Sequence, residues 1–172
     1  RAVTAVGDQG KEFHARHHVL SLTAGSLYTD SSLDENSHFA AYTNIKPNQV
    51  TRKPTNISWE EAACIPTAFL TSYFALNHTA KLKNGEKVLI HTASGGVGLS
   101  AIQIARWLGA RIFVTAGTDL KREYLRSMGF EHPMDSRTMD FAKEIMQRTP
   151  YEGVFVILNT LAGEAAVEGL KI

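Results

Sequence analysis

The spacing of apolar positions changes near residue 60 of this 172-residue chain. Before that point, apolar residues come in short groups that alternate with polar ones, a pattern typical of β-strands. Three groups of this kind predict strands at residues 2–7, 19–22 and 38–43. Turn-forming residues separate the groups, most densely over residues 28–37. The first third of the chain is therefore predicted to be all-β.

A helix is predicted to begin at about Trp59, after an extended connector over residues 47–56. The sequence Ser58-Trp59-Glu60-Glu61 fits a capping box, in which a serine hydroxyl and a glutamate carboxylate bind the first free amides of a helix. Pro66 has no amide hydrogen and is expected to end or interrupt this helix. Apolar spacing then predicts a second helical stretch over Thr67–Ala80.

From Lys81 onward, short apolar runs alternate with helix-like segments. Strands without polar alternation, separated by helices, indicate a parallel sheet that is covered on both faces. The predicted strands are Lys87–His91, Arg111–Ala116, a weak one near Pro133–Asp135, and Val154–Leu158. The predicted helices are Val97–Leu108, Asp119–Met128, Met139–Arg148 and one that begins at Ala162. The second part of the chain is therefore predicted to be α/β.

Composition narrows the classes of partner. Eighteen Lys and Arg stand against seventeen Asp and Glu, so the formal net charge is +1. That balance, without a dense basic cluster, argues against nucleic acid or an anionic membrane surface as a partner. No apolar run approaches the roughly 18–20 residues of a membrane helix, and no signal-peptide core stands near the start, so we expect a cytoplasmic protein. The single cysteine, Cys64, excludes an internal disulfide.

The segment Ser94-Gly95-Gly96-Val97-Gly98 lies where a predicted strand turns into a predicted helix. Such a turn lets backbone amides and the helix dipole meet a pyrophosphate, because no side chain blocks the approach. Compared with the pattern G-x-G-x-x-G, Ala93 stands at the first glycine, Gly95 is the glycine of close approach, and Gly98 lets the helix pack on the strand. We therefore predict a dinucleotide-binding loop rather than a simple connector.

The end of the next strand indicates which dinucleotide is bound. NAD-binding units carry an acidic residue about 20 residues further on, which binds the ribose hydroxyls. Counting 20 residues from Gly98 leads to Thr118, so no acidic residue stands at this position. Asp119 follows it, and then Lys121 and Arg122. A small hydroxyl residue with nearby cations suits a 2′-phosphate, so NADPH is favoured over NADH. The missing acid also argues against a methyltransferase that uses S-adenosylmethionine, and Arg122 is interpreted as a solvated residue on the helix surface.

Five segments carry a family resemblance: Glu60–Pro66, Phe69–Leu76, Ala93–Gly98, Ser136–Phe141 and Val156–Glu164. They resemble the medium-chain dehydrogenase/reductase superfamily and, within it, the enoyl reductase domains of polyketide and fatty acid synthases. The strings SRTMDF and LNTLAGE narrow the resemblance to synthase domains, since free-standing quinone reductases usually lack that pair. Residues 1–57 resemble, more loosely, the end of the superfamily's GroES-like substrate domain.

The resemblance implies a Rossmann-like parallel sheet preceded by part of a GroES-like β domain. Residues 1–63 would be the carboxyl-terminal part of that substrate domain with its connector, and residues 64–172 the amino-terminal part of the NADPH-binding domain. Such sheets have about six strands, whereas four are predicted here, so we expect an incomplete domain. The isolated chain is expected to be inactive.

The implied reaction is reduction of an α,β-unsaturated thioester carried on an acyl carrier protein. NADPH would deliver hydride to the β-carbon, and the resulting enolate would be protonated at the α-carbon. Other domains of a synthase are implied partners, and pairing of two copies is a further option. Two alternatives stay open: a free-standing, zinc-independent NADPH:quinone or alkenal reductase, and a non-catalytic nucleotide-binding module.

The resemblance also assigns cofactor-binding residues. The pyrophosphate would be contacted by Ser94, Gly95, Gly96, Val97 and Gly98. The 2′-phosphate would be contacted by Thr118, Lys121 and Arg137, and the nicotinamide end would lie near Thr71 and Asn159, with Ser136 and Leu161 as further cofactor candidates. The alternative for Thr71 is a hydroxyl bonded to its own helix backbone, and the alternative for Ser136 and Arg137 is a capping role at the next helix.

No metal site and no catalytic residue is predicted. Zinc-dependent relatives have a cysteine ligand where this chain has Thr67, and the nearby Cys64 is interpreted as a small buried side chain. His14, His17 and His18 lack acids or cysteines at ligand spacing and are interpreted as part of a solvated loop. The lysine and aspartate proposed as proton donors in the family lie beyond the LNTLAGE segment and have no match, so the catalytic residues stay unknown.

Overall fold

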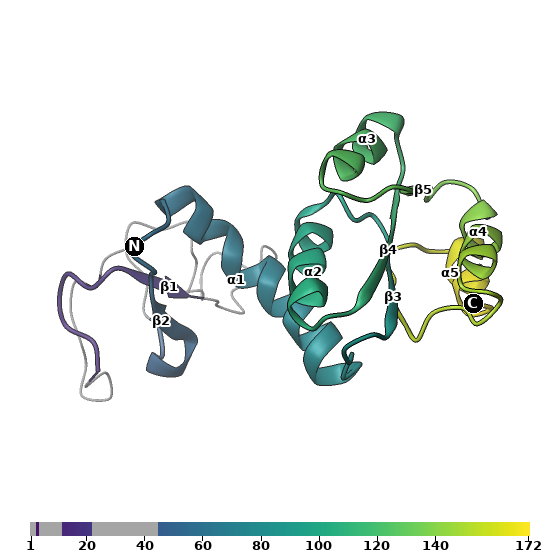
Figure 1. Ribbon diagram of the computed structural model, residues 1–172. Coiled ribbons are helices and arrows are strands. Elements are labelled where there is room, and N and C mark those ends of the chain that lie inside the picture. Colours follow the sequence, from purple (N-terminus) through teal and green to yellow (C-terminus); the bar gives the residue numbers. More distant parts are fainter. Residues whose placement is uncertain (1–2, 4–11, 22–44) are drawn as a thin grey trace. The chain divides into compact units, whose positions relative to one another are not determined.

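The computed structural model describes residues 3, 12–21 and 45–172 (Figure 1). The chain divides into two compact units, Arg1–Thr67 and Ala68–Ile172. The strands predicted at residues 2–7 and 38–43 fall outside the described residues, apart from residue 3. In the described part of the chain, no helix is both long and apolar enough to span a membrane.

The first unit contains a two-stranded antiparallel sheet. Strand β1, Val19–Ser21, pairs with β2, Val50–Arg52, and Leu20 lies opposite Thr51. The predicted strand over 19–22 is thus confirmed, whereas β2 was not expected. A short 3-10 turn, Pro47–Gln49, leads directly into β2. Because β2 has only three residues, two of them polar, it lacks the apolar alternation by which a strand is recognised.

Helix α1 spans Trp59–Tyr73 and starts at the predicted capping box. The Glu61 amide donates to Ser58 Oγ at 3.1 Å, and the Ser58 amide donates to Glu61 Oε2 at 2.8 Å. The expectation that Pro66 ends or interrupts the helix is wrong, since α1 continues through it. Proline removes one backbone donor but leaves the flanking turns free to bond. After Tyr73 the helix changes to a π-helix, η2, over Phe74–Thr79.

The second unit is α/β and contains a parallel sheet with the strand order β5-β4-β3-β6. The strands are β3 Lys87–Ile90, β4 Arg111–Ala116, β5 Met134–Asp135 and β6 Val156–Leu158. The helices are α2 Gly96–Trp107, α3 Asp119–Ser127, α4 Asp140–Arg148 and α5 Glu164–Gly169. The predicted α/β class is therefore confirmed, and every strand or helix boundary predicted from Lys81 onward lies within two residues of the observed one.

The strand order creates a switch point in the sheet. From β3 the chain passes outward to β4 and then β5, and α4 leads back across the sheet to β6 on the other side of β3 (Figure 1). Because all four strands are parallel, the loops that follow them emerge at the same edge. In open sheets of this kind, ligands bind at that edge, where the strand order reverses.

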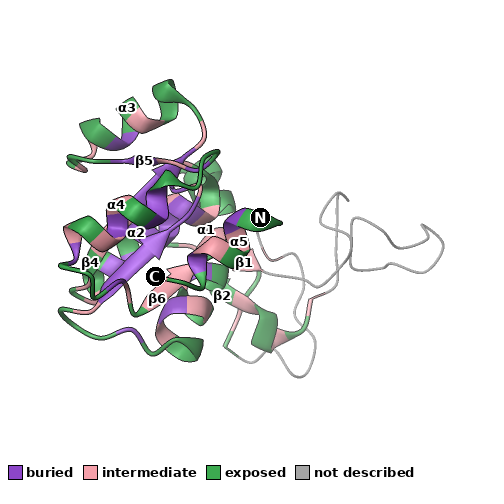
Figure 2. Cartoon of the chain, turned by 90° about the vertical axis from the view of Figure 1, so that its right-hand side faces the viewer, coloured by how far each residue is buried: buried purple, intermediate pink, exposed green. Residues whose placement is uncertain are grey.

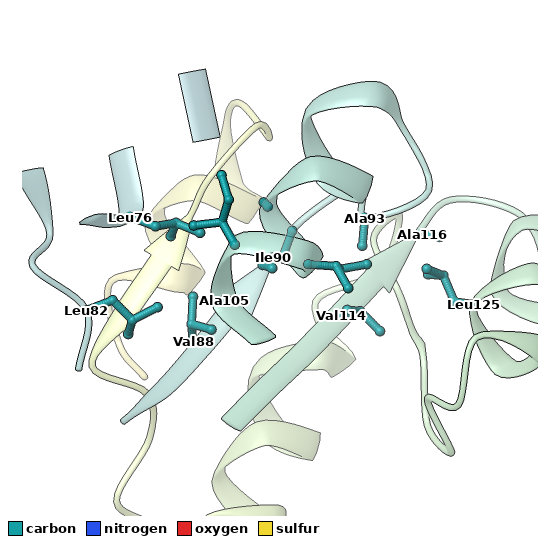
Figure 3. Close-up of a cluster of buried hydrophobic side chains, with 12 residues drawn as sticks. Leu76, Leu82, Val88, Ile90, Ala93, Ala105, Val114, Ala116 and Leu125 are labelled. Atoms are coloured by element: carbon teal, nitrogen blue, oxygen red, sulfur yellow. The ribbon is translucent and has the colours of Figure 1, made fainter. Parts of the chain in front are cut away.

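Two apolar clusters hold the sheet from opposite faces. Val88 and Ile90 of β3 belong to one cluster, which includes Leu125 of α3 (Figure 3). The intervening Leu89 belongs to the other, with Phe141 of α4. All three β3 residues are fully buried, and the central strands form the largest buried region in the α/β unit (Figure 2). Burial on both faces explains why β3 is a continuous apolar run.

Candidate cofactor-binding site

The glycine loop joins β3 to the amino end of α2. Gly95 is the N-cap residue of α2, no side chain caps this end, and the first turn contains no acidic residue. A Cβ atom built on Gly96 would meet nothing within 4 Å. The first amides of α2 are therefore uncapped by side chains and are not opposed by a negative charge, which is the arrangement that binds a phosphate group.

Gly98 allows α2 to pack closely against the loop. A Cβ atom at this position would lie 2.5 Å from Cα of Ala93 and 2.7 Å from its carbonyl oxygen. Ala93 cannot easily move away, because its amide donates to the carbonyl of Thr115 on β4 at 2.9 Å. The packing role predicted for Gly98 is confirmed.

A buried serine pair fixes the first turns of α2, and sequence reasoning missed it. The Oγ atoms of Ser72 and Ser100 lie 2.7 Å apart, and both residues are buried. Ser72 Oγ donates to the carbonyl of Val97 at 3.0 Å, and Ser100 Oγ lies 2.9 Å from the carbonyl of Ala68. These contacts hold α2 against the second half of α1. A serine inside a helix gives no sequence signal that separates such a contact from a solvated hydroxyl.

His91 lies directly after β3 and is buried below the loop. Its Nδ1 is 2.9 Å from Thr115 Oγ1, and its ring meets Phe141 edge to face at 4.9 Å. No hydrogen-bond partner for Nε2 is present among the described residues. Burial lowers the pKa of His91 to about 4, so the imidazole is neutral at physiological pH. The residue therefore brings packing but no charge to the site.

Side chains from two loops meet at the carboxyl end of β4. Thr118 caps α3, because its Oγ1 accepts from the amide of Lys121 at 3.3 Å. The side chain of Arg137 reaches the same place, since its Nε lies 3.2 Å from the position of a Cβ on Gly117. Ser136 Oγ lies 3.4 Å from that position. The structure thus gathers the candidates predicted for the 2′-phosphate around the tip of β4.

The capping alternative for Ser136 and Arg137 is wrong. The N-cap residue of α4 is Met139, which has no side-chain cap bond. The Ser136 amide instead donates to the carbonyl of Ala116 at 3.3 Å, which joins this loop to β4.

Arg122 is not the solvated residue that we predicted. Its side chain is only 13% exposed, forms an ion pair with Asp119, and lies 3.0 Å from Asp135 Oδ2. Nη1 also donates to the carbonyl of Ala116 at 2.9 Å. The sequence missed this contact because Asp135 belongs to a different strand. Both acids near the tip of β4 are therefore bound by Arg122.

The loop after β6 is shaped by the side chain of Asn159. Its Oδ1 accepts from the amide of Leu161 at 2.9 Å, and its Nδ2 donates to the carbonyl of Leu161 at 3.2 Å. Between these residues, Thr160 places its Oγ1 2.6 Å from Oγ1 of Thr92 in the glycine loop. The loops on either side of the switch point are therefore in direct contact.

A family model described as zinc-binding dehydrogenase matches residues 96–172. The chain is 40% identical over 170 residues to a phenolphthiocerol/phthiocerol polyketide synthase of Mycobacterium tuberculosis, a match that covers 99% of this chain and 7% of that protein. A mycocerosic acid synthase-like polyketide synthase of Mycolicibacterium smegmatis is 39% identical over 137 residues, which cover 80% of this chain and 6% of that protein.

Solved structures with similar sequences also have a similar fold. The crystal structure of CurK enoyl reductase is 42% identical with a TM-score of 0.86, and the match covers 98% of this chain and 47% of that one. The chain belongs to the medium-chain dehydrogenase/reductase superfamily. Within this superfamily, it is 51% identical to the nucleotide-binding subdomain of the enoylreductase domain of PpsC from Mycobacterium tuberculosis, with a TM-score of 0.60 and coverage of 61% and 59% of the two chains. The chain thus spans about half of the solved enoyl reductase of CurK and a small part of the curated synthases.

The matching family model is named for zinc binding, but the described residues of this chain contain no set of zinc ligands. Within residues 3, 12–21 and 45–172, no group of three or more His, Cys, Asp or Glu residues could hold a metal ion. His17 Nδ1 accepts from the amide of His14 at 3.0 Å, and the ring of His18 packs on Trp59 at 4.7 Å. Cys64 is exposed, so its interpretation as a buried side chain is wrong. On α1, Ala62 is fully buried, and Cys64 two residues later points elsewhere.

Thr71 lies on α1 and is exposed, next to the buried Ser72. Its hydroxyl makes no hydrogen bond with any described residue, so the alternative that it bonds to its own helix backbone is wrong. Its place near the nicotinamide of a superfamily member therefore stays a prediction.

Proposed function

We propose that this chain is part of an enoyl reductase domain of a polyketide or fatty acid synthase. The observation that carries the proposal is the match to CurK enoyl reductase over 98% of this chain at 42% identity, which includes all four loops at the carboxyl edge of the sheet. The substrate would be an α,β-unsaturated acyl thioester on an acyl carrier protein. Other synthase domains would be partners, two copies would pair, and the protein would act in the cytoplasm.

The cofactor would lie along the carboxyl edge of the sheet. The loop from Ser94 to Gly98, together with the uncapped first amides of α2, would hold the pyrophosphate. Asn159 and Leu161 would shape the pocket for the nicotinamide end, and Thr71 would lie near it. When bound, the dinucleotide supplies the hydride for the reduction. Residues 1–63 would complete the substrate domain, and residues 64–172 would belong to the nucleotide-binding domain.

NADPH is the proposed cofactor, because the tip of β4 favours a phosphate over free ribose hydroxyls. Lys121 and Arg137 form no ion pair with any described residue, so both cations can bind an anion, and Thr118 and Ser136 add hydroxyls beside them. The two acids that could instead accept bonds from ribose hydroxyls, Asp119 and Asp135, are bound by Arg122. Because Lys121 and Arg137 are positively charged and both carboxylates are already paired with Arg122, this site suits a 2′-phosphate.

The activity can be tested with the complete protein that contains this chain. We expect it to oxidise NADPH in the presence of a crotonyl thioester and to release the saturated butyryl thioester, identified by mass. It should not oxidise NADPH in the presence of quinones. The product must be identified because the CurF enoyl reductase domain, 35% identical with a TM-score of 0.86, is a cyclopropanase. Reduction of quinones but not of the thioester would contradict the proposal and support a free-standing quinone reductase.

A further inference from the structure

The contact between Thr92 and Thr160 continues the pairing of β3 with β6. In this parallel pair Ile90 lies opposite Leu158, and the amide of His91 donates to the carbonyl of Leu158 at 3.2 Å. Two residues further along each strand, the Oγ1 atoms of Thr92 and Thr160 are 2.6 Å apart. A side-chain hydrogen bond thus replaces the next rung of the ladder.

This contact lies at the switch point of the sheet. β3 leads outward to β4 on one side, and β6 lies on its other side. The two loops that the contact joins have different roles in the proposed function, since one leads to the amino end of α2 and the other carries Asn159 and Leu161. A dinucleotide that crosses this point would touch both loops, so their separation matters for its binding.

The backbone of Thr92 is strained. Its φ is +47°, in the left-handed region that is disfavoured for a β-branched residue. Glycine or asparagine would adopt this conformation more easily. The strained turn is closed by a bond from the Gly95 amide to the Thr92 carbonyl at 2.9 Å, and it directs the Thr92 hydroxyl to Thr160. Strained residues of this kind are concentrated at functional sites.

The Thr160 side of the contact is also fixed in place. Asn159 binds both the amide and the carbonyl of Leu161, at 2.9 Å and 3.2 Å, so Thr160 lies inside a closed turn. Neither hydroxyl therefore needs a rearrangement of its loop to reach the other. A bond between two pre-shaped loops adds little stability to the fold but restricts how far the loops can separate.

We propose that Thr92 and Thr160 form a hydroxyl latch that sets the distance between the two cofactor-facing loops. Both are positioning residues, and the proposal rests on the proposed function because it assumes that a dinucleotide spans the two loops. The latch would increase affinity by holding both loops in their bound arrangement before the cofactor arrives.

A double-mutant cycle in the complete protein tests the latch. The variants are Thr92→Val, Thr160→Val and their combination, which keep the side-chain shape but remove the hydroxyls. Thr160→Ser is the matched control, since it keeps the hydroxyl and loses only a methyl group. Two measurements are made: hydrogen exchange without cofactor in peptides covering residues 92–95 and 159–161, and the dissociation constant of NADPH.

Exchange should rise in both peptides in either valine variant, and each variant should weaken NADPH binding about 2- to 10-fold. The double variant should be no weaker than the singles, because one bond is lost in all three. Thr160→Ser should match the wild type in both measurements. Independent, additive losses, unchanged exchange, or a serine variant that behaves like valine would each overturn the latch. Absence of NADPH binding by the wild type would instead overturn the proposed function, and the exchange data would still test the contact.

Discussion

The Gly98→Ala variant is expected to lose roughly 3 kcal/mol of unfolding free energy, the upper range for forcing an extra methyl group into a packed site. The new Cβ would lie 2.5 Å from Cα of Ala93, and the contact is with backbone rather than with a flexible side chain. Ala93 is bonded to β4 through Thr115, so α2 or the loop has to move. Thermal unfolding of the purified protein, followed by tryptophan fluorescence, measures the loss.

Gly96→Ala is the matched control for this variant. A Cβ on Gly96 meets nothing within 4 Å, and this glycine begins α2. Alanine favours a helix over glycine by up to about 1 kcal/mol, so the stability should be unchanged or slightly raised. Equal losses in the two variants would contradict the packing role of Gly98 and indicate a general intolerance of the loop to side chains.

The Arg137→Ala variant is expected to bind NADPH about 10- to 100-fold more weakly, the range for losing hydrogen bonds to a charged group. Its affinity for NADH should be unchanged, because NADH has no 2′-phosphate to contact. The prediction follows from the position of Nε beside Gly117 at the tip of β4. Isothermal titration of both cofactors measures the two affinities.

Arg126→Ala controls for the loss of positive charge. Arg126 lies in the last turn of α3, and Lys121 lies in the first turn of the same helix near the proposed phosphate. The Arg126 variant removes the same charge at the far end of the helix and should leave both affinities unchanged. Arg137→Ala with equal losses for NADPH and NADH would show that Arg137 maintains the fold of the loop and does not select the phosphate.

Features set by neighbouring residues could be predicted from the sequence. The capping box at Ser58 and Glu61 involves residues three apart, and both of its bonds form as expected. Strand β3 is a continuous apolar run because both of its faces are buried, so its composition alone identifies it. The packing role of Gly98 followed from its place after a strand and at the start of a helix.

Features that depend on distant residues could not be predicted. Arg122 resembles any charged residue on a helix surface, and only the sheet brings Asp135 from β5 beside it. The serine pair joins residues 28 positions apart, and the Thr92–Thr160 contact joins residues 68 apart. For Pro66 the local rule was misleading, since it predicted an end or interruption of the helix and α1 continues through this residue.

The most direct test of the cofactor assignment is a comparison of NADPH and NADH binding by the wild-type protein. In the proposed arrangement, the carboxyl edge of the sheet holds a dinucleotide whose 2′-phosphate lies between Lys121 and Arg137. We therefore expect NADPH to bind at least about tenfold more tightly than NADH, the effect of one or more bonds to a charged group. Equal affinities would contradict the assignment of the β4 tip, and tighter binding of NADH would show that Asp119 or Asp135 leaves Arg122 to bind the ribose.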